Sequence, residues 1–257
     1  MAHNEIKAST HSTSFDSVLL AAARILTFNK QNPLTNASGF FYECDGKLFL
    51  ITSRHVVVDE PSGHFPDRLE IELHLDSENL AVSTMYSIPL YRDGKGIWIQ
   101  GLDSSGSIDV AAIEIEKSRL PEKTLYRAFT PEHLHRPENE IEVGTPLLVV
   151  GFPLGFHDGL HHLPVVRQAI VASSFGLRFQ GEGFFLTDAR THRGTSGAPV
   201  VMRMNRIKDS VMAELPWCLL GVHSARMDLG TRDVVLDEAL GLNCAWYADI
   251  LPTLTRG

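Results

Sequence analysis

Cysteine is scarce in this chain of 257 residues, and long apolar runs are missing. The three cysteines are an odd number with no CxxC spacing, so neither a disulfide scaffold nor a cysteine-based zinc site is expected. No stretch approaches the roughly 20 apolar residues of a membrane span, and the polar N-terminus does not resemble an export signal. We therefore expect a protein of a reducing compartment, the cytoplasm.

The chain has fewer basic than acidic residues, 23 Lys and Arg against 31 Asp and Glu, which gives a net charge of −8. Nucleic acids and anionic membranes are bound by basic surfaces, so we expect neither as a partner. Apolar residues make up 44% and charged residues 21% of the chain. This composition can build a sizeable core and argues against a disordered protein.

Long helical patterns are absent, and short strands alternate with turns rich in Gly, Pro, Asp and Ser. Residues 69–75 alternate strictly between apolar and polar side chains, which is typical of a half-buried strand. The dipeptide Asp45-Gly46 between two apolar runs predicts a hairpin. This pattern predicts an all-β protein, a sandwich or a barrel. Strands are expected at 24–28, 40–44, 48–52, 69–75, 85–90, 96–100, 110–115, 147–150, 165–172, 184–187, 199–202, 218–223 and 234–236.

Two short helices are expected, at 15–22, with an extended segment as the alternative, and at 243–251, with Asn243 as its cap. The apolar pattern lapses between 118 and 142, where prolines and acidic residues gather, so we expect a linker between two halves of similar size. The expected organisation is an N-terminal segment (1–23), a first half (24–120), the linker (121–142) and a second half (143–257).

The segment 191–199, THRGTSGAP, carries the strongest chemical signal. A serine between two glycines can sit on a tight turn with its hydroxyl exposed, and Gly194 lets backbone N–H groups converge on one point. Two further segments supply partners for Ser196, because His55 follows an apolar run and Asp109 opens another. Each of the three alone is often structural: a surface turn, a packed histidine or a cap.

The order His55, Asp109, Ser196 differs from the order in subtilisins and in α/β-hydrolases. The chain resembles the trypsin-like serine peptidases, most closely their HtrA-type branch, whose motifs are TxxHV, DxA and GxSG[GA]P. Here these motifs read TSRHV at 52–56, DVA at 109–111 and GTSGAP at 194–199. The run VVGFPLG at 149–155 is similar to a strand end of that branch, whereas no PDZ-like module is expected.

The resemblance implies a chymotrypsin-like fold of two six-stranded β-barrels with a short C-terminal helix, and a serine endopeptidase without a cofactor. Ser196 is then the nucleophile, His55 the general base and Asp109 the residue that orients His55. The backbone N–H groups of Gly194 and Ser196 would form the oxyanion hole. The partner is a protein or peptide substrate.

Thr195 stands where many secreted members of the family carry an aspartate that pairs with a new N-terminus after zymogen cleavage. Threonine makes no ion pair, so activation would not be of the zymogen type. Because an unregulated protease is hazardous in the cytoplasm, control by a regulatory protein partner is a hypothesis.

Thr191 and His223 resemble the threonine and histidine with which bacterial glutamyl endopeptidases and picornaviral main proteases bind Glu or Gln at P1. Both side chains can hydrogen-bond a carboxylate or amide oxygen, and Arg190 would add positive charge. The resemblance therefore implies a preference for Glu or Gln at P1. The alternative is that His223 is a packed strand residue and that Arg190 faces solvent.

His157, His161 and His162 raise the question of a metal site. The spacing of His157 and His161 suits a pair of zinc ligands on a helix. The dipeptide Asp158-Gly159 favours a turn instead, and no third ligand is evident. We therefore expect a loop near the cleft and no metal.

Two other functions stay open. A catalytically silent or partner-activated protease-like module would bind peptides as a sensor. An esterase would use Ser196, Asp209 and His223, but the strand-rich pattern and the alanine at 198, where a GxSxG elbow needs glycine, oppose it.

Overall fold

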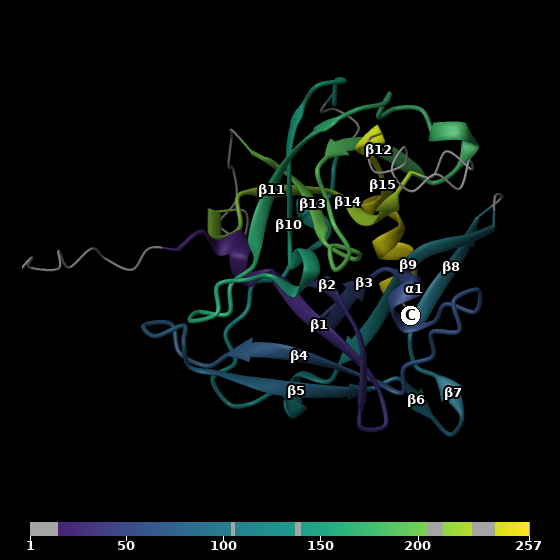
Figure 1. Cartoon of the computed structure of the whole chain (residues 1–257). Coiled ribbons are helices and arrows are strands. Elements are labelled where there is room, and N and C mark those ends of the chain that lie inside the picture. The colour runs from purple at the N-terminus through teal and green to yellow at the C-terminus, as the bar shows by residue number, and fades with distance from the viewer. Residues whose placement is uncertain (1–14, 104–105, 137–139, 205–212, 228–239, 257) are drawn as a thin grey trace, which may run out of the picture.

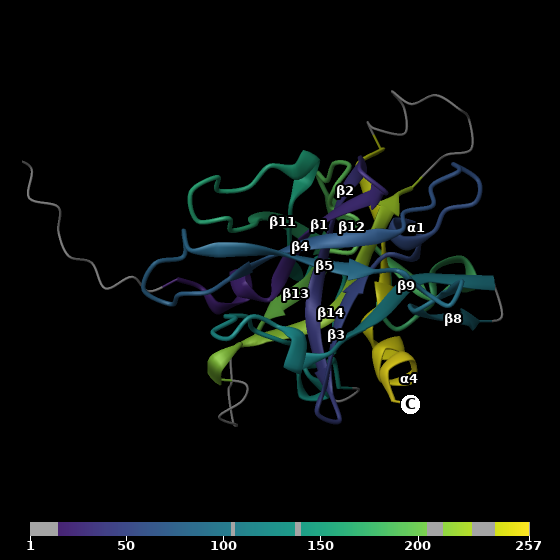
Figure 2. The same cartoon turned by 90° about the horizontal axis from the view of Figure 1, so that it is seen from below.

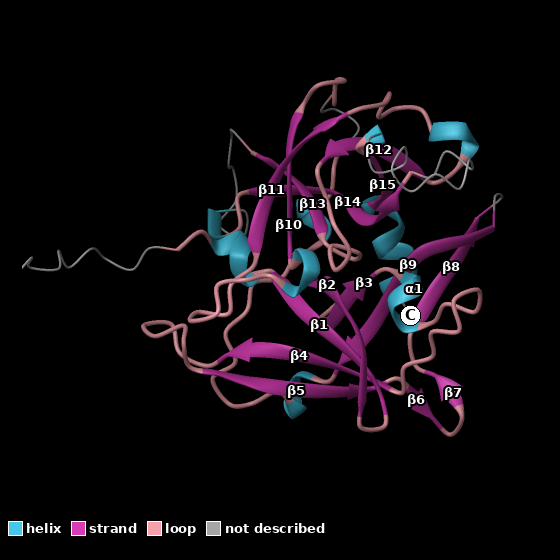
Figure 3. Ribbon diagram, viewed as in Figure 1, coloured by secondary structure: helices cyan, strands magenta, loops and turns pink. Residues whose placement is uncertain are grey.

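The computed structural model describes residues 15–103, 106–136, 140–204, 213–227 and 240–256, and strands dominate it (Figures 1 and 3). One sheet comes from the first half of the chain and one from the second, and the two lie against each other (Figure 1). Within the described residues, no helix has the length and apolar character to cross a bilayer.

The first sheet has seven antiparallel strands in the order β5-β4-β1-β2-β3-β9-β8. Asp45 and Gly46 both have positive φ and turn β2 into β3, which is the predicted hairpin. This sheet is open, with β5 and β8 as its edge strands, whereas a closed barrel of six strands was expected here. The strands are β1 (Ala22–Asn29), β2 (Asn32–Cys44), β3 (Lys47–Thr52), β4 (Arg68–His74), β5 (Ser83–Pro89), β8 (Ile99–Asp103) and β9 (Gly106–Ile115).

The second sheet closes into a six-stranded barrel in the order β10-β11-β12-β15-β14-β13, as expected. Its interior is filled by alternate side chains of these strands, among them Val149, Phe185 and Leu220. The strands are β10 (Pro146–Gly151), β11 (Val165–Val171), β12 (Phe184–Ala189), β13 (Pro199–Arg203), β14 (Trp217–Arg226) and β15 (Leu242–Tyr247).

The remaining described elements are short. The C-terminal helix α4 leaves the barrel and packs against β8 and β9 of the first sheet (Figure 2). These elements are η1 (Ser17–Leu20), α1 (Arg54–Val57), β6 (Tyr91–Arg92), β7 (Lys95–Gly96), η2 (Lys117–Arg119), η3 (Pro131–His133), η4 (Pro153–Gly155), η5 (Phe179–Gly181), η6 (Ala248–Ile250) and α4 (Leu251–Thr255).

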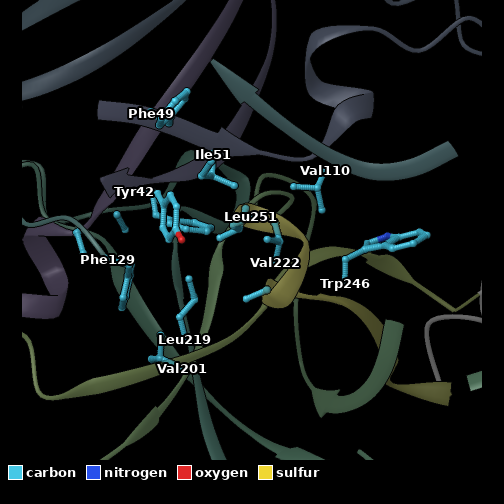
Figure 4. Packing of buried hydrophobic residues seen from close by; sticks show 14 of the residues in the cluster. Tyr42, Phe49, Ile51, Val110, Phe129, Val201, Leu219, Val222, Trp246 and Leu251 are labelled. Atoms are coloured by element: carbon cyan, nitrogen blue, oxygen red, sulfur yellow. The ribbon is translucent and has the colours of Figure 1, made fainter. Parts of the chain in front are cut away.

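The main core lies between the sheet and the barrel (Figure 4). Phe49 and Ile51 of β3 face this core, while Leu48 and Leu50 face a second cluster on the other side of the sheet. Strand β3 is therefore buried on both faces, which explains why its sequence is a continuous apolar run rather than an alternating one.

The interval expected as a linker is packed against both sheets where the structure describes it. The backbone of Phe129 pairs with β2, donating to the carbonyl of Phe41 and accepting from the N–H of Glu43. Its ring lies edge-on to Phe40 at 5.7 Å between centroids and is fully buried. Further on, Leu134 pairs with Leu219 of the barrel.

Most predicted strands are found, and both predicted helices differ. The interval 96–100 is split between β7 and β8, and 234–236 lies outside the described residues. The helix predicted at 243–251 is wrong, because residues 242–247 form strand β15 and α4 begins at Leu251. Asn243 is fully buried there and hydrogen-bonds the carbonyl of Ala189, so it acts inside the barrel and not as a helix cap. The helix predicted at 15–22 is reduced to η1, since β1 already begins at Ala22.

Replacing Phe129 by alanine is expected to lower the free energy of unfolding by about 3–5 kcal/mol, because a buried ring is lost between the two sheets. Phe156→Ala is the matched control, since that ring is 68% exposed and its loss should change stability by about 0.5 kcal/mol or less. Denaturant unfolding followed by circular dichroism measures both. Equal losses in the two variants would contradict this account of the core.

Candidate active site

His55 and Asp109 meet because β3 and β9 are neighbours in the first sheet. His55 lies in the single turn of α1, directly after β3, and Asp109 lies in β9. The carboxylate accepts two hydrogen bonds from His55, from its backbone N–H at 2.9 Å and from Nδ1 at 2.8 Å. A third comes from the hydroxyl of Ser224 in β14. These bonds place the proton of the imidazole on Nδ1 and leave Nε2 as the free base.

The pKa of His55 is raised and the pKa of Asp109 is lowered. Burial acts to lower the pKa of His55, but the hydrogen bond and the negative charge of Asp109 outweigh it and raise the pKa. Burial acts to raise the pKa of Asp109, but the bonds from His55 and Ser224 outweigh it and lower the pKa. The carboxylate therefore stays charged, and it favours the protonated form of His55.

Ser196 lies in the segment that joins β12 to β13, here called the serine loop (residues 190–198). Its carbonyl accepts a hydrogen bond from the N–H of Ser38 in β2 at 2.9 Å. The next N–H, of Gly197, donates to the carbonyl of His223 at 2.7 Å. The loop is thus held by the first sheet on one side of Ser196 and by the barrel on the other.

Both glycines of the serine motif are required by geometry. Gly194 and Gly197 have φ values of +90° and +85°, where other residues are strained. A Cβ on Gly194 would overlap Asn36, and one on Gly197 would overlap the backbone of Ser38. This close packing is the physical reason for the GTSG pattern.

The N–H groups of Gly194 and Ser196 are the expected oxyanion donors. The carbonyl of Arg193 accepts a hydrogen bond from the N–H of Leu154 at 2.6 Å. Because C=O and N–H point in opposite directions across a trans peptide, the N–H of Gly194 points away from Leu154. Among the described residues, neither this N–H nor that of Ser196 has a hydrogen-bond acceptor.

The predicted catalytic residues lie around a cavity of about 490 Å³. His55, Gly194 and Ser196 line it, and Asp109 contacts His55 through Nδ1. Its other walls include the exposed side chains of Leu34 and Leu154. The arrangement puts a hydroxyl, an imidazole base and two unpaired N–H groups around one space.

The three predicted specificity residues have different surroundings. Thr191 and His223 are 4% and 2% exposed and do not line this cavity, whereas Arg190 is exposed. Burial and the nearby charge of His55 lower the pKa of His223 to about 4, so its ring is neutral at physiological pH. Its Nδ1 is buried and has no hydrogen-bond partner among the described residues.

Thr191 and His223 lie on the same side of β15. Thr191 donates its hydroxyl proton to Oδ1 of Asn243, whose Nδ2 donates to the carbonyl of Ala189. His223 pairs with Ala245, two residues along β15 from Asn243. Residues two apart in a strand share a face, so Asn243 and His223 point to the same side.

Four contributors to the site were not predicted. Ser224 bonds Asp109, Ser38 holds the serine loop, Leu154 holds the carbonyl of Arg193, and Asn36 lines the cavity with a buried Oδ1 that has no partner among the described residues. Ser224 follows His223 directly, and Leu154 lies in the VVGFPLG run. That run was noted, but its contact with the serine loop was not.

Comparison with known proteins identifies the class. Residues 37–207 match the family described as trypsin-like peptidase domain, and the chain belongs to this family. The fold is also similar to that of the serine endoprotease from Yersinia pestis, with a TM-score of 0.53 and 15% sequence identity. The match covers 93% of this chain but only 62% of the Yersinia chain. No curated protein matches the sequence.

The two histidines are expected to titrate far apart in an NMR titration, with His55 above the 6.5 of an exposed histidine and His223 near 4. Asp109→Asn should lower the pKa of His55, because its charge and the acceptor for Nδ1–H are lost. The pKa of His223 should stay well below 6.5 in the same variant, since burial is the main cause of its low value. An unchanged titration of His55 in the variant would contradict the pairing.

The same shift predicts how stability depends on pH. Because the pKa of His55 is higher in the folded than in the unfolded protein, its stabilising effect is complete below about pH 6.5 and is lost as pH rises through the folded-state pKa. The stability lost on Asp109→Asn should therefore be larger at about pH 5.5 than above the raised pKa.

Proposed function

We propose that this protein is a serine endopeptidase that cleaves peptide bonds through Ser196, His55 and Asp109. The observation that carries the proposal is that Ser196, the imidazole of His55 and the N–H of Gly194 share one cavity, with Asp109 bonded to Nδ1 of His55. Membership of the trypsin-like peptidase domain family supports it.

The mechanism follows from the arrangement of protons. Nε2 of His55 takes the proton of the Ser196 hydroxyl as the oxygen attacks the substrate carbonyl. The N–H groups of Gly194 and Ser196 stabilise the oxyanion, each worth about 10²–10³ in rate. His55 then gives its proton to the leaving amine, and water hydrolyses the acyl-enzyme with His55 again as base. Asp109 stays ionised and stabilises the imidazolium.

The proposed P1 residue is glutamine rather than glutamate, and the hydrogen bonds around Thr191 support this choice. Nδ2 of Asn243 donates to the carbonyl of Ala189, so its Oδ1 faces Thr191 and takes the hydroxyl proton. Thr191 then has only lone pairs to offer a substrate, which suit the N–H of an amide and repel a carboxylate. The neutral ring of His223 would donate one N–H to the amide oxygen.

We further propose that the protein acts on protein or peptide substrates in the cytoplasm, under the control of a partner, as a relative of the HtrA-type and glutamyl-endopeptidase-like branch. The division into halves at 24–120 and 143–257 supports an active site assembled between them. Asp109 comes from β9 of the first sheet and His55 from α1 directly after β3, and Ser196 comes from the loop before β13.

Labelling with a fluorophosphonate probe tests the nucleophile. Wild-type protein should label, and Ser196→Ala and His55→Ala should not. The same variants should lose on the order of 10⁶ in kcat on peptides, because the three residues act as a unit. Ser62→Ala is the matched control, since it removes an exposed hydroxyl from the wall of the same cavity.

Other outcomes of this labelling support the alternatives. A folded wild-type protein that does not label would favour a silent or partner-activated peptide-binding module. In a separate assay with casein as substrate, constitutive cleavage would contradict control by a partner. An esterase using His223 requires that His223→Ala abolishes labelling and His55→Ala spares it; its third residue, Asp209, lies outside the described residues.

Cleavage of a peptide library tests the proposed P1 residue. Peptides with Gln at P1 should be cut roughly 10- to 100-fold faster than those with Glu, the difference made by one buried hydrogen bond. Asn243→Ala frees the hydroxyl proton of Thr191 and should shift the Gln-to-Glu ratio toward Glu. The exposed Arg190 gives the control, since Arg190→Gln should leave the ratio unchanged. A preference for Glu that disappears in Arg190→Gln would contradict the proposal.

A further inference from the structure

The β10–β11 loop (residues 152–164) carries three histidines and lies beside β1 and β4 of the first sheet (Figures 1 and 2). It has no helix at His157 and His161, and a turn occupies 159–161. The zinc pair considered from the sequence spacing is therefore not formed. A different set is formed, because His157 and His162 meet Glu72 of β4, a third ligand that the sequence did not reveal.

The ligand atoms of Glu72, His157 and His162 all lie within 4.8 Å of one another. Nδ1 of His162 is 3.0 Å from Oε1 of Glu72. Zinc bonds of about 2.0–2.2 Å set neighbouring ligand atoms roughly 3.4 Å apart in a tetrahedron, so small side-chain movements bring the three atoms to one ion.

The surroundings orient two of these ligands. Nδ1 of His157 donates to the carbonyl of Gly155 at 2.7 Å, which fixes its proton there and leaves the lone pair of Nε2 for a cation. Oε1 of Glu72 accepts from the hydroxyl of Ser83 at 2.8 Å. Such outer hydrogen bonds from carbonyls and hydroxyls are typical of protein metal sites.

A cation already lies against these atoms. Nη1 of Arg24 is 2.9 Å from Nε2 of His157, and its Nη2 is 3.7 Å from Oε2 of Glu72. The remaining guanidinium nitrogen, Nε, is buried and has no partner among the described residues. The guanidinium therefore has one unpaired nitrogen. It lies where the lone pairs of His157 and Glu72 favour a positive charge.

We propose that Glu72, His157 and His162 bind a divalent transition-metal ion, with the guanidinium of Arg24 as the competing occupant. Two imidazoles and a carboxylate are a donor set that suits zinc, with water as the fourth ligand. The ion would cross-link β4 to the β10–β11 loop. Glu72 and His162 keep 11% and 25% of their side chains exposed, which gives the ion a path from solvent.

Calorimetric titration of the whole chain with zinc chloride tests the proposal. We expect one zinc ion per chain, with His157→Ala and His162→Ala each weakening binding by at least about 100-fold, since loss of an outer-shell partner alone costs 10–100-fold. His161→Ala is the matched control, because this histidine is in the same loop but bonds Asp158 and lies outside the cluster. His55→Ala controls for zinc bound in the cavity of Ser196.

Arg24→Gln should tighten zinc binding, because the competing charge is removed. X-ray absorption of zinc bound to wild-type protein needs no variant and should show two imidazoles with oxygen ligands. The proposal is overturned if wild type binds no stoichiometric zinc, if His161→Ala weakens binding as much as His157→Ala, if Arg24→Gln does not tighten it, or if sulfur ligates the ion.

Discussion

The buried side chain and backbone of Ser38 join the first sheet to the barrel at the point where the candidate site is built. Its hydroxyl donates to the carbonyl of Gly194 at 2.8 Å and accepts from the N–H of Phe152 at 2.9 Å, while its backbone N–H holds the carbonyl of Ser196. Any side chain at Gly151 would displace this hydroxyl. One small residue of β2 thus fixes both the serine loop and the start of the β10–β11 loop.

The β10–β11 loop extends this connection. Near its start, the N–H of Leu154 holds the carbonyl of Arg193, so the N–H of Gly194 on the same peptide points away from Leu154. Further along, the carbonyl of His161 accepts from Nε2 of His74 in β4 at 2.7 Å, next to the cluster around Glu72. Contacts that fasten the loop to β4 therefore also restrain the segment that holds the serine loop at Arg193.

Sequence patterns predicted what is local or repeated along the chain, and missed what depends on distant contacts. The strands, the Asp45-Gly46 hairpin and the GTSG turn each follow from neighbouring residues. Asn243 was misplaced because a cap and a buried strand amide look alike until Thr191 and Ala189 are beside it. Ser38 and Glu72 are ordinary residues of β2 and β4, and only the folded chain brings them to the serine loop and the histidines.

Asp109 acts on the pKa values of two histidines, His55 and His223, whose surroundings shift these values in opposite directions. Burial acts to lower the pKa of His55, but the hydrogen bond and the charge of Asp109 together outweigh it and raise the pKa. His223 is enclosed in the barrel, where desolvation and the charge on His55 outweigh Asp109 and hold its pKa near 4. Each of the two rings makes protonation of the other less favourable. The site therefore pairs a histidine whose protonated form Asp109 favours with a neighbouring histidine that stays neutral.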